Sequence, residues 1–228
     1  MNELINWTNT NSGFLTLLIF VITLLFGWIS GIFNNLRHRP KFIIDIIPIP
    51  TFCSVFETGN IYKDYKATKT AIVIYLKIKN IGTAPSEIEK IQVSYHNHTF
   101  KYTFLWFWLD TIIALKDFGH KIGNNGDVRY YPFLVQENIT RAIKSTNYLE
   151  SGKNVNGIVY FEQHESYGGF IPKVKNNKVK IKIKVFDVYN SSYSKIFWIP
   201  IVDLEYARKF NEKFGESLKE IEEGNISK

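Results

Sequence analysis

Hydrophobic and polar residues alternate along most of the chain after Lys41, with the period of two that is typical of β-strands. Residues 70–80, TAIVIYLKIKN, predict a half-buried strand. Its apolar face carries Ile72, Ile74, Leu76 and Ile78, and its other face carries Val73, Tyr75, Lys77 and Lys79. Comparable segments lie at 41–48, 88–96, 128–135, 157–163, 178–188 and 193–201, separated by turn-forming residues. Because few helical segments intervene, the pattern predicts a mainly β fold, an antiparallel sandwich or barrel over residues 42–202.

Residues 13–33, GFLTLLIFVITLLFGWISGIF, contain no charged residue and do not alternate. A helix of this length is about 30 Å long, close to the thickness of a bilayer's hydrocarbon core. The run is longer than a signal-peptide hydrophobic region, and the short polar N-terminus 1–12 contains no Lys or Arg. We therefore expect a single transmembrane helix at 13–33, with Trp28 at the membrane interface.

The basic juxtamembrane linker 34–41 contains Arg37, Arg39 and Lys41, whereas only Glu3 is charged before the helix. Positively charged flanks stay on the cytoplasmic side. The expected location is the inner cell membrane, with the N-terminus outside and the C-terminal domain in the cytoplasm. A single cysteine, Cys53, agrees with a reducing compartment.

The C-terminal segment 203–228 predicts an amphipathic helix and tail, with Asp203 as the N-cap. Gly215 is expected to weaken or bend this helix. The apolar face of this helix is expected to pack against the sandwich; the alternative is that it binds a partner. This apolar stripe consists of Leu204, Ala207, Phe210, Phe214, Leu218 and Ile221.

Three turn signatures give the β region a likeness to a known architecture. They are KNIGTAP after an early strand, LESGKNVNGIVYFE before a late one, and a final hairpin KIKVFDVYNSSYSKIFWIPI. In these signatures the region 41–202 resembles bacterial immunoglobulin-like β-sandwich domains. The resemblance implies an architecture only, since such domains serve many functions, and the Cys–Trp–Cys core of antibody domains is missing.

A second apolar segment, Tyr102 to Leu115, is rich in aromatic residues but too short to span a membrane. One interpretation places it in the core. The other places it at the lipid headgroups, flanked by Lys101 and Lys116, through Tyr102, Phe104, Trp106 and Trp108.

The net charge of +7 favours contact with something acidic. The positive charge is most concentrated in the segment KVKIKIKVF. One face of this predicted strand presents Lys178, Lys180, Lys182 and Lys184. The pattern indicates a solvated face or an edge strand protected from pairing with other chains. Attraction to anionic lipid is the functional alternative, and no nucleic-acid-binding motif accompanies the charge.

Candidate chemistry is sparse. His96 and His98 share one face of a strand, and Glu162 and His164 have the same spacing, so two strands could together build a metal site. The alternative is that His96 and His98 lie at a strand end and face water. No nucleophile elbow and no phosphate-binding loop is present.

The sequence therefore favours a non-enzymatic, membrane-anchored binding or scaffold protein without a cofactor. Its expected partners are membrane lipid and either a protein or a second copy of the chain; nucleic acid is not expected. One alternative is a membrane-perturbing effector that acts by oligomerisation, a layout similar to anchored effectors of bacterial anti-phage systems. A second alternative is a metal-dependent enzyme that uses His96 and His98.

Overall fold

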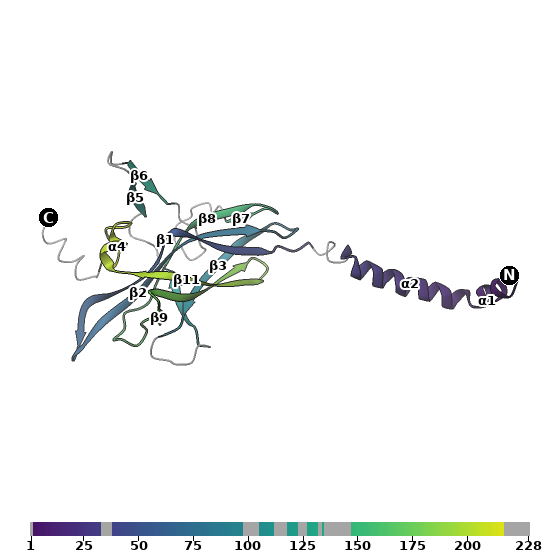
Figure 1. Cartoon of the computed structure of the whole chain (residues 1–228), viewed down its shortest axis with the longest axis horizontal. Helices are drawn as coiled ribbons and strands as arrows, with labels where there is room; N and C mark the ends of the chain where they lie inside the picture. The colour runs from purple at the N-terminus through teal and green to yellow at the C-terminus, as the bar shows by residue number, and fades with distance from the viewer. Residues whose placement is uncertain are drawn as a thin grey trace.

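The computed structural model describes residues 2–32, 38–97, 105–111, 118–122, 127–131, 134 and 147–216. They form two N-terminal helices and a mainly β body (Figure 1). The helices are α1 (Asn2–Thr10) and α2 (Ser12–Ile29), so the polar N-terminus is itself helical.

Helix α2 has the composition of a membrane-spanning segment. It has 18 residues, a mean hydropathy of 2.3 and no buried residue, and no other helix in the described part of the chain meets the same criteria. Thr16 and Thr23 donate to carbonyl oxygens one turn earlier, Ser12 O at 2.8 Å and Ile19 O at 2.7 Å. Their hydroxyls are therefore satisfied within the helix, as an apolar environment requires.

The β body begins with two long strands, β1 (Phe42–Tyr62) and β2 (Tyr65–Asn80). The strands that follow are β3 (Ser86–Tyr95), β4 (Phe107–Thr111), β5 (Gly119–Ile122), β6 (Asp127–Tyr130), β7 (Tyr148–Leu149), β8 (Asn154–Glu162), β9 (Val174–Lys175), β10 (Lys178–Asp187) and β11 (Ser192–Val202). Each strand segment expected from alternation overlaps one of these, whereas β4, β5, β7 and β9 were not among the segments that the alternation identified.

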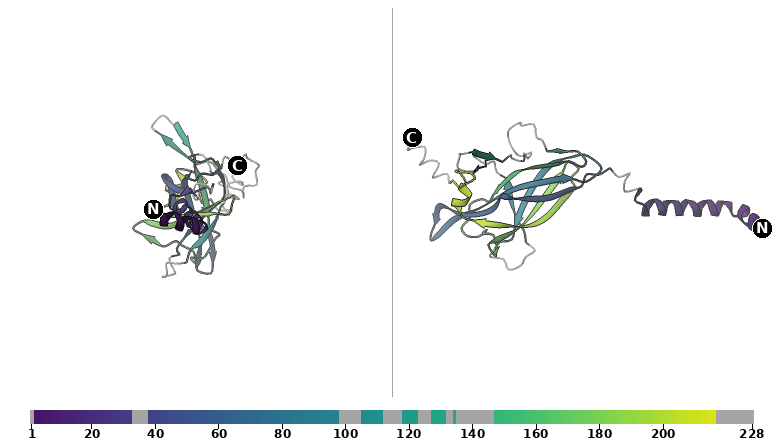
Figure 2. Two further views of the ribbon diagram at one scale, coloured as in Figure 1. Left: turned by 90° about the vertical axis from the view of Figure 1, so that its right-hand side faces the viewer. Right: turned by 45° about the horizontal axis from the view of Figure 1, so that its top comes forward.

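Seven strands pair in a closed order. The sequence of neighbours β3–β4–β8–β2–β1–β11–β10 returns to β3, because β3 pairs with β4 on one side and β10 on the other. Figure 2 shows the β body from two further directions. The pairing of β1 with β11 is parallel and the other six are antiparallel. The sheet is therefore mixed, which corrects the expectation of a purely antiparallel arrangement.

The inner faces of these strands enclose the main hydrophobic core. The expected face of β2 is confirmed, since Ile72, Ile74, Leu76 and Ile78 are all buried in this core. Val179, Ile181, Ile183 and Val185 fill it from β10, each with no exposed surface.

A second core covers the outer face of β1, β2 and β8. Side chains that point outward from the closed set of seven strands there, such as Phe52 and Val73, are buried under Phe118 and the C-terminal segment. Val73 was expected on the exposed side of a half-buried strand, and that expectation was wrong because residues distant in sequence cover it.

The C-terminal segment provides much of this cover, as expected. Asp203 is the N-cap of α4 (Leu204–Arg208), accepting a hydrogen bond from the Tyr206 backbone N–H at 2.7 Å. The helix is only five residues long, and Gly215 has a left-handed backbone with φ of +68°. Leu204, Ala207, Phe210 and Phe214 pack on the second core, whereas Leu218 and Ile221 lie outside the described residues.

The NIGTAP turn holds the chain where it enters the body. A Cβ on Gly82 would lie 2.3 Å from the carbonyl oxygen of Arg39 and 2.4 Å from the backbone nitrogen of Lys41. The Ile81 backbone N–H donates to Lys41 O at 2.8 Å, which fixes the start of β1 against this turn. Glycine is required here because the two backbones approach too closely for any side chain.

Candidate functional site

The outer face of β11, β10, β3 and β4 carries tryptophans and lysines from distant parts of the sequence. Residues directly opposite in antiparallel strands point to the same side of a sheet. Lys182 lies opposite Ile196 on β11 and Ser94 on β3, and Ser94 lies opposite Trp108 on β4. In the adjacent row, Lys180 lies opposite Trp198. We call this surface the Trp–Lys face: Trp106, Trp108, Lys180, Lys182, Ile196 and Trp198.

The large apolar side chains of this face are open to solvent. Trp108 is 43% exposed, Trp198 46% and Ile196 48%. The ammonium groups of Lys180 and Lys182 lie 6.0 and 5.8 Å from the centre of the Trp106 ring, within the range of a cation–π contact. Neither lysine has a carboxylate partner among the described residues, so the face combines exposed indole surface with uncompensated positive charge.

His96 supports the Trp–Lys face from beneath. Its ring lies 3.9 Å from the ring of Trp106, and the side chain is only 5% exposed. Nδ1 lies 2.6 Å from the Leu105 carbonyl oxygen, which can only accept, so Nδ1 carries the proton. Nε2 is buried and has no hydrogen-bond partner among the described residues. Burial lowers the pKa of His96, and the nearby charges of Lys180 and Lys173 lower it further.

Two expectations about these residues need correction. His96 follows the end of β3 as expected, but it does not face water. The lysine alternation on β10 is confirmed as an outward face, whereas the edge-strand interpretation was wrong, because β10 pairs with β11 on one side and β3 on the other.

The described part of the aromatic segment lies partly in the core, and its placement at the lipid headgroups stays a prediction. Leu109 is 5% exposed and belongs to the main core, while its neighbour Trp108 points outward. Strand alternation explains the division, because successive side chains lie on opposite faces. Tyr102 and Phe104 lie outside the described residues.

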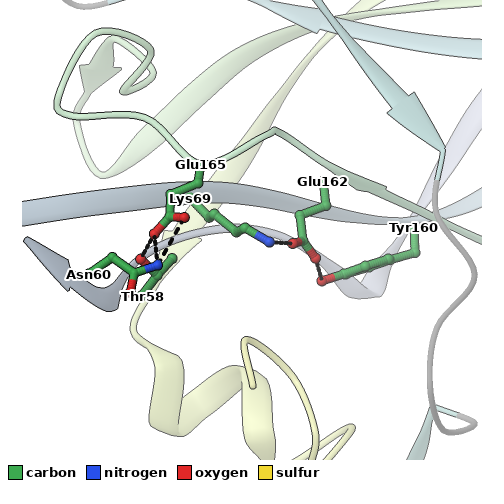
Figure 3. A network of polar contacts seen from close by, with 6 residues as sticks. All are labelled: Thr58, Asn60, Lys69, Tyr160, Glu162 and Glu165. Atoms are coloured by element: carbon green, nitrogen blue, oxygen red, sulfur yellow. Dashed lines mark hydrogen bonds and ion pairs between the residues drawn. The ribbon is translucent and has the colours of Figure 1, made fainter. Parts of the chain in front are cut away.

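Glu162, a candidate metal ligand, is held by other side chains (Figure 3). Its carboxylate forms an ion pair with Lys69 at 2.7 Å and accepts a hydrogen bond from the Tyr160 hydroxyl at 2.8 Å. Burial raises the pKa of Tyr160, and the charge of Glu162 raises it further. Nearby, Glu165 accepts hydrogen bonds from Thr58 and Asn60, so the segment is tied to the β1–β2 hairpin.

The structure does not bring the candidate metal ligands onto adjacent strands. Strand β4 lies between β3, which precedes His96, and β8, which ends at Glu162. Two strand spacings are about 10 Å, too far for ligands of one ion. His164 lines a pocket of about 200 Å³ with Glu162 and Trp108, and His98 lies outside the described residues. No group of three His, Cys, Asp or Glu side chains in the described part of the chain could hold a metal.

The remaining expected interface residues belong to the N-terminal region. Trp28 is 72% exposed near the end of α2, and Arg39 is exposed beside the NIGTAP turn. Arg37 lies outside the described residues. Sequence reasoning missed Trp198 and Ile196, although their alternation with Phe197 and Ile199 was a usable signal.

Comparison with known proteins gives little. No protein-family model matches the chain, and no curated protein matches its sequence. A search of solved structures finds the archaellum periplasmic stator protein FlaG from Sulfolobus acidocaldarius, at 14% identity and a TM-score of 0.23. The alignment covers 64% of this chain and 99% of that one.

Proposed function

We propose that the protein is a single-pass, membrane-anchored binding module with no catalytic role. Helix α2 is the anchor, the N-terminus lies outside, and the β body lies in the cytoplasm at the inner membrane. The exposed apolar surface of α2 and the basic residues that follow it support this arrangement.

We also infer that the β body is an immunoglobulin-like sandwich, as the turn signatures suggest. In such domains the first two strands pair, the second pairs with the fifth, and the third, sixth and seventh form the other sheet. The pairings β1–β2, β2–β8, β3–β10 and β10–β11 follow that order, with β4 completing the contact between the sheets. The bacterial origin stays a prediction.

The observation that carries the proposed binding role is the Trp–Lys face. Indole rings favour the lipid headgroup region, and each lysine near an anionic bilayer contributes about 1 kcal/mol of attraction. Residues 30–41 separate α2 from β1 and can reach about 40 Å when extended, so the face can meet the surface of the membrane that holds the anchor. We therefore infer that it docks on anionic lipid.

Charged substitutions within α2 test whether this helix anchors the protein in the membrane. In full-length protein, Leu18→Arg combined with Leu24→Arg places two charges inside α2, each costing about 3 kcal/mol in a bilayer. The variant should move from the carbonate-resistant membrane fraction to the soluble fraction. External protease should leave the β body of the wild type intact in spheroplasts and digest it after lysis. Digestion before lysis would contradict the proposed topology.

The docking is tested with tryptophan fluorescence. Three of the five tryptophans lie on the Trp–Lys face, and the others are Trp7 and Trp28 in the N-terminal helices. In a Trp7→Phe, Trp28→Phe protein, all remaining tryptophan emission comes from the face. Vesicles of phosphatidylglycerol with brominated acyl chains should quench this emission, and brominated phosphatidylcholine should not. Equal emission in both vesicles would refute docking on anionic lipid.

A further inference from the structure

A hollow of about 800 Å³ lies at the junction of the β5–β6 hairpin, β1 and the C-terminal segment, away from the Trp–Lys face. Its volume is within the range of small-molecule sites, about 300 to 1,000 Å³. Aromatic and basic side chains dominate its lining: Tyr75, Arg129, Tyr130, Tyr131, Tyr206 and Lys209.

Hydrogen bonds and ring contacts tie the walls of this hollow together. The Gly119 backbone N–H donates to Phe210 O at 2.9 Å, which joins the hairpin to the C-terminal segment. The rings of Tyr75 and Tyr131 lie 5.6 Å apart in an edge-on contact, which joins the hairpin to β2. The shift in register between Ile47 and Phe52 leaves Ile49 on β1 outside the ladder, 56% exposed at the rim. The hollow is therefore formed before any ligand arrives.

The charged side chains that line the hollow among the described residues are both basic. Arg129 and Lys209 line it and neither has a carboxylate partner among the described residues, and no described Asp or Glu is part of its lining. Arginine presents a planar set of donors that matches phosphate or carboxylate oxygens. Tyr130, which lines the same hollow, is 68% exposed, so much of its ring is open to solvent.

We propose that the hollow binds a planar aromatic anion of nucleotide size. The aromatic group stacks on the tyrosine rings, as nucleotide bases stack on aromatic side chains. The anionic group accepts hydrogen bonds from Arg129 and Lys209, which form the stronger, charge-assisted kind. This inference does not depend on the lipid contact, because the two surfaces share no residue.

Calorimetric titration of full-length protein in zwitterionic nanodiscs tests the proposal, with AMP, GMP and UMP as probes. At least one should bind, and the corresponding nucleoside and inorganic phosphate alone should each bind at least about tenfold more weakly, because each lacks one half of the recognition.

Variants locate the site. Arg129→Gln and Lys209→Gln should each weaken nucleotide binding about tenfold, and Tyr130→Ala about fivefold. Lys63→Gln and Lys153→Gln remove the same charge from exposed turns outside the lining and should change nothing. Lys180→Gln with Lys182→Gln should reduce lipid docking and leave nucleotide binding unchanged, so failure of one proposal is distinguishable from failure of the other.

The proposal is overturned if none of the three nucleotides binds at about 1 mM. It is also overturned if Arg129→Gln and Lys209→Gln bind a nucleotide as tightly as wild type. Self-association of the chain that these two variants abolish would assign the hollow to a protein interface, and would likewise refute a small anionic ligand.

Discussion

The outer faces of β1–β2–β8 and of β11–β10–β3–β4 both carry large aromatic side chains, but within the described part of the chain only the first face is covered. Phe52 and Tyr160 on the covered face are buried under the C-terminal segment. Trp108 and Trp198 on the other face stay more than 40% exposed, with Lys180 and Lys182 beside them. The same residue class is structural where the protein provides its own cover, and is available for binding where it does not.

The largest effect on stability is expected from a substitution in the C-terminal segment that covers β1, β2 and β8. Phe214 is 2% exposed and contacts four aromatic rings, so Phe214→Ala should lower the free energy of unfolding by about 3–5 kcal/mol. Trp198→Ala on the uncovered face should change it by no more than about 0.5 kcal/mol. Urea unfolding of the two detergent-solubilised variants measures both. Similar losses for the two would contradict the distinction between the faces.

The reverse pattern is expected for lipid contact. Lys180→Gln with Lys182→Gln removes about 2 kcal/mol of attraction to an anionic surface, equivalent to about a 30-fold weaker docking equilibrium. Bromine quenching in phosphatidylglycerol vesicles should fall accordingly, while urea unfolding stays unchanged. Lys63→Gln with Lys153→Gln is the matched control, and equal effects of the two pairs would show that net charge alone matters.

This contrast could be predicted only where the contacting residues lie close together in the sequence. Alternation along β2 and β10 identified the inner core correctly because each strand carries its own signal. Packing of the C-terminal stripe on the sandwich was predicted, but its contact with Val73 was not, since Phe210 and Phe214 come from the far end of the chain and no local pattern shows which strand face they cover. The lysines and Trp106 were noticed separately, but no local pattern shows that β3 lies between β10 and β4.

His96 makes the uncovered face sensitive to pH. Its pKa is lowered in the folded state, so the unfolded chain binds the proton more readily, and stability falls as the pH drops through about 6.5. His96→Phe keeps an aromatic ring against Trp106 and removes the titrating group. Urea midpoints measured from pH 8 to pH 5 should decline less in this variant. An identical slope would exclude His96 as the source.

The last prediction concerns stability at the boundary between the two faces, where β1 pairs with β11. There Asp45 on β1 forms ion pairs with Lys195 on β11 at 2.8 Å and with Lys79 on β2 at 3.1 Å. Hydrogen bonds from Lys195 and then Lys79 lower the pKa of Asp45. The stabilisation is present above the unfolded value near 3.9 and is lost as the pH falls through the lower folded value. Because these groups are more than a third exposed, Asp45→Asn should cost no more than about 1 kcal/mol in urea unfolding at pH 7. A larger loss of unfolding free energy would show that these ion pairs are a main contact between the two faces.

Hydroxyl-radical footprinting of the full-length protein in nanodiscs compares the two regions most directly. In phosphatidylglycerol discs, oxidation of Trp108 and Trp198 should fall several-fold relative to phosphatidylcholine discs. Tyr130, which is exposed at the separate hollow, should react equally in both. Equal oxidation of the two tryptophans in both lipids would contradict the account that the uncovered face meets the membrane.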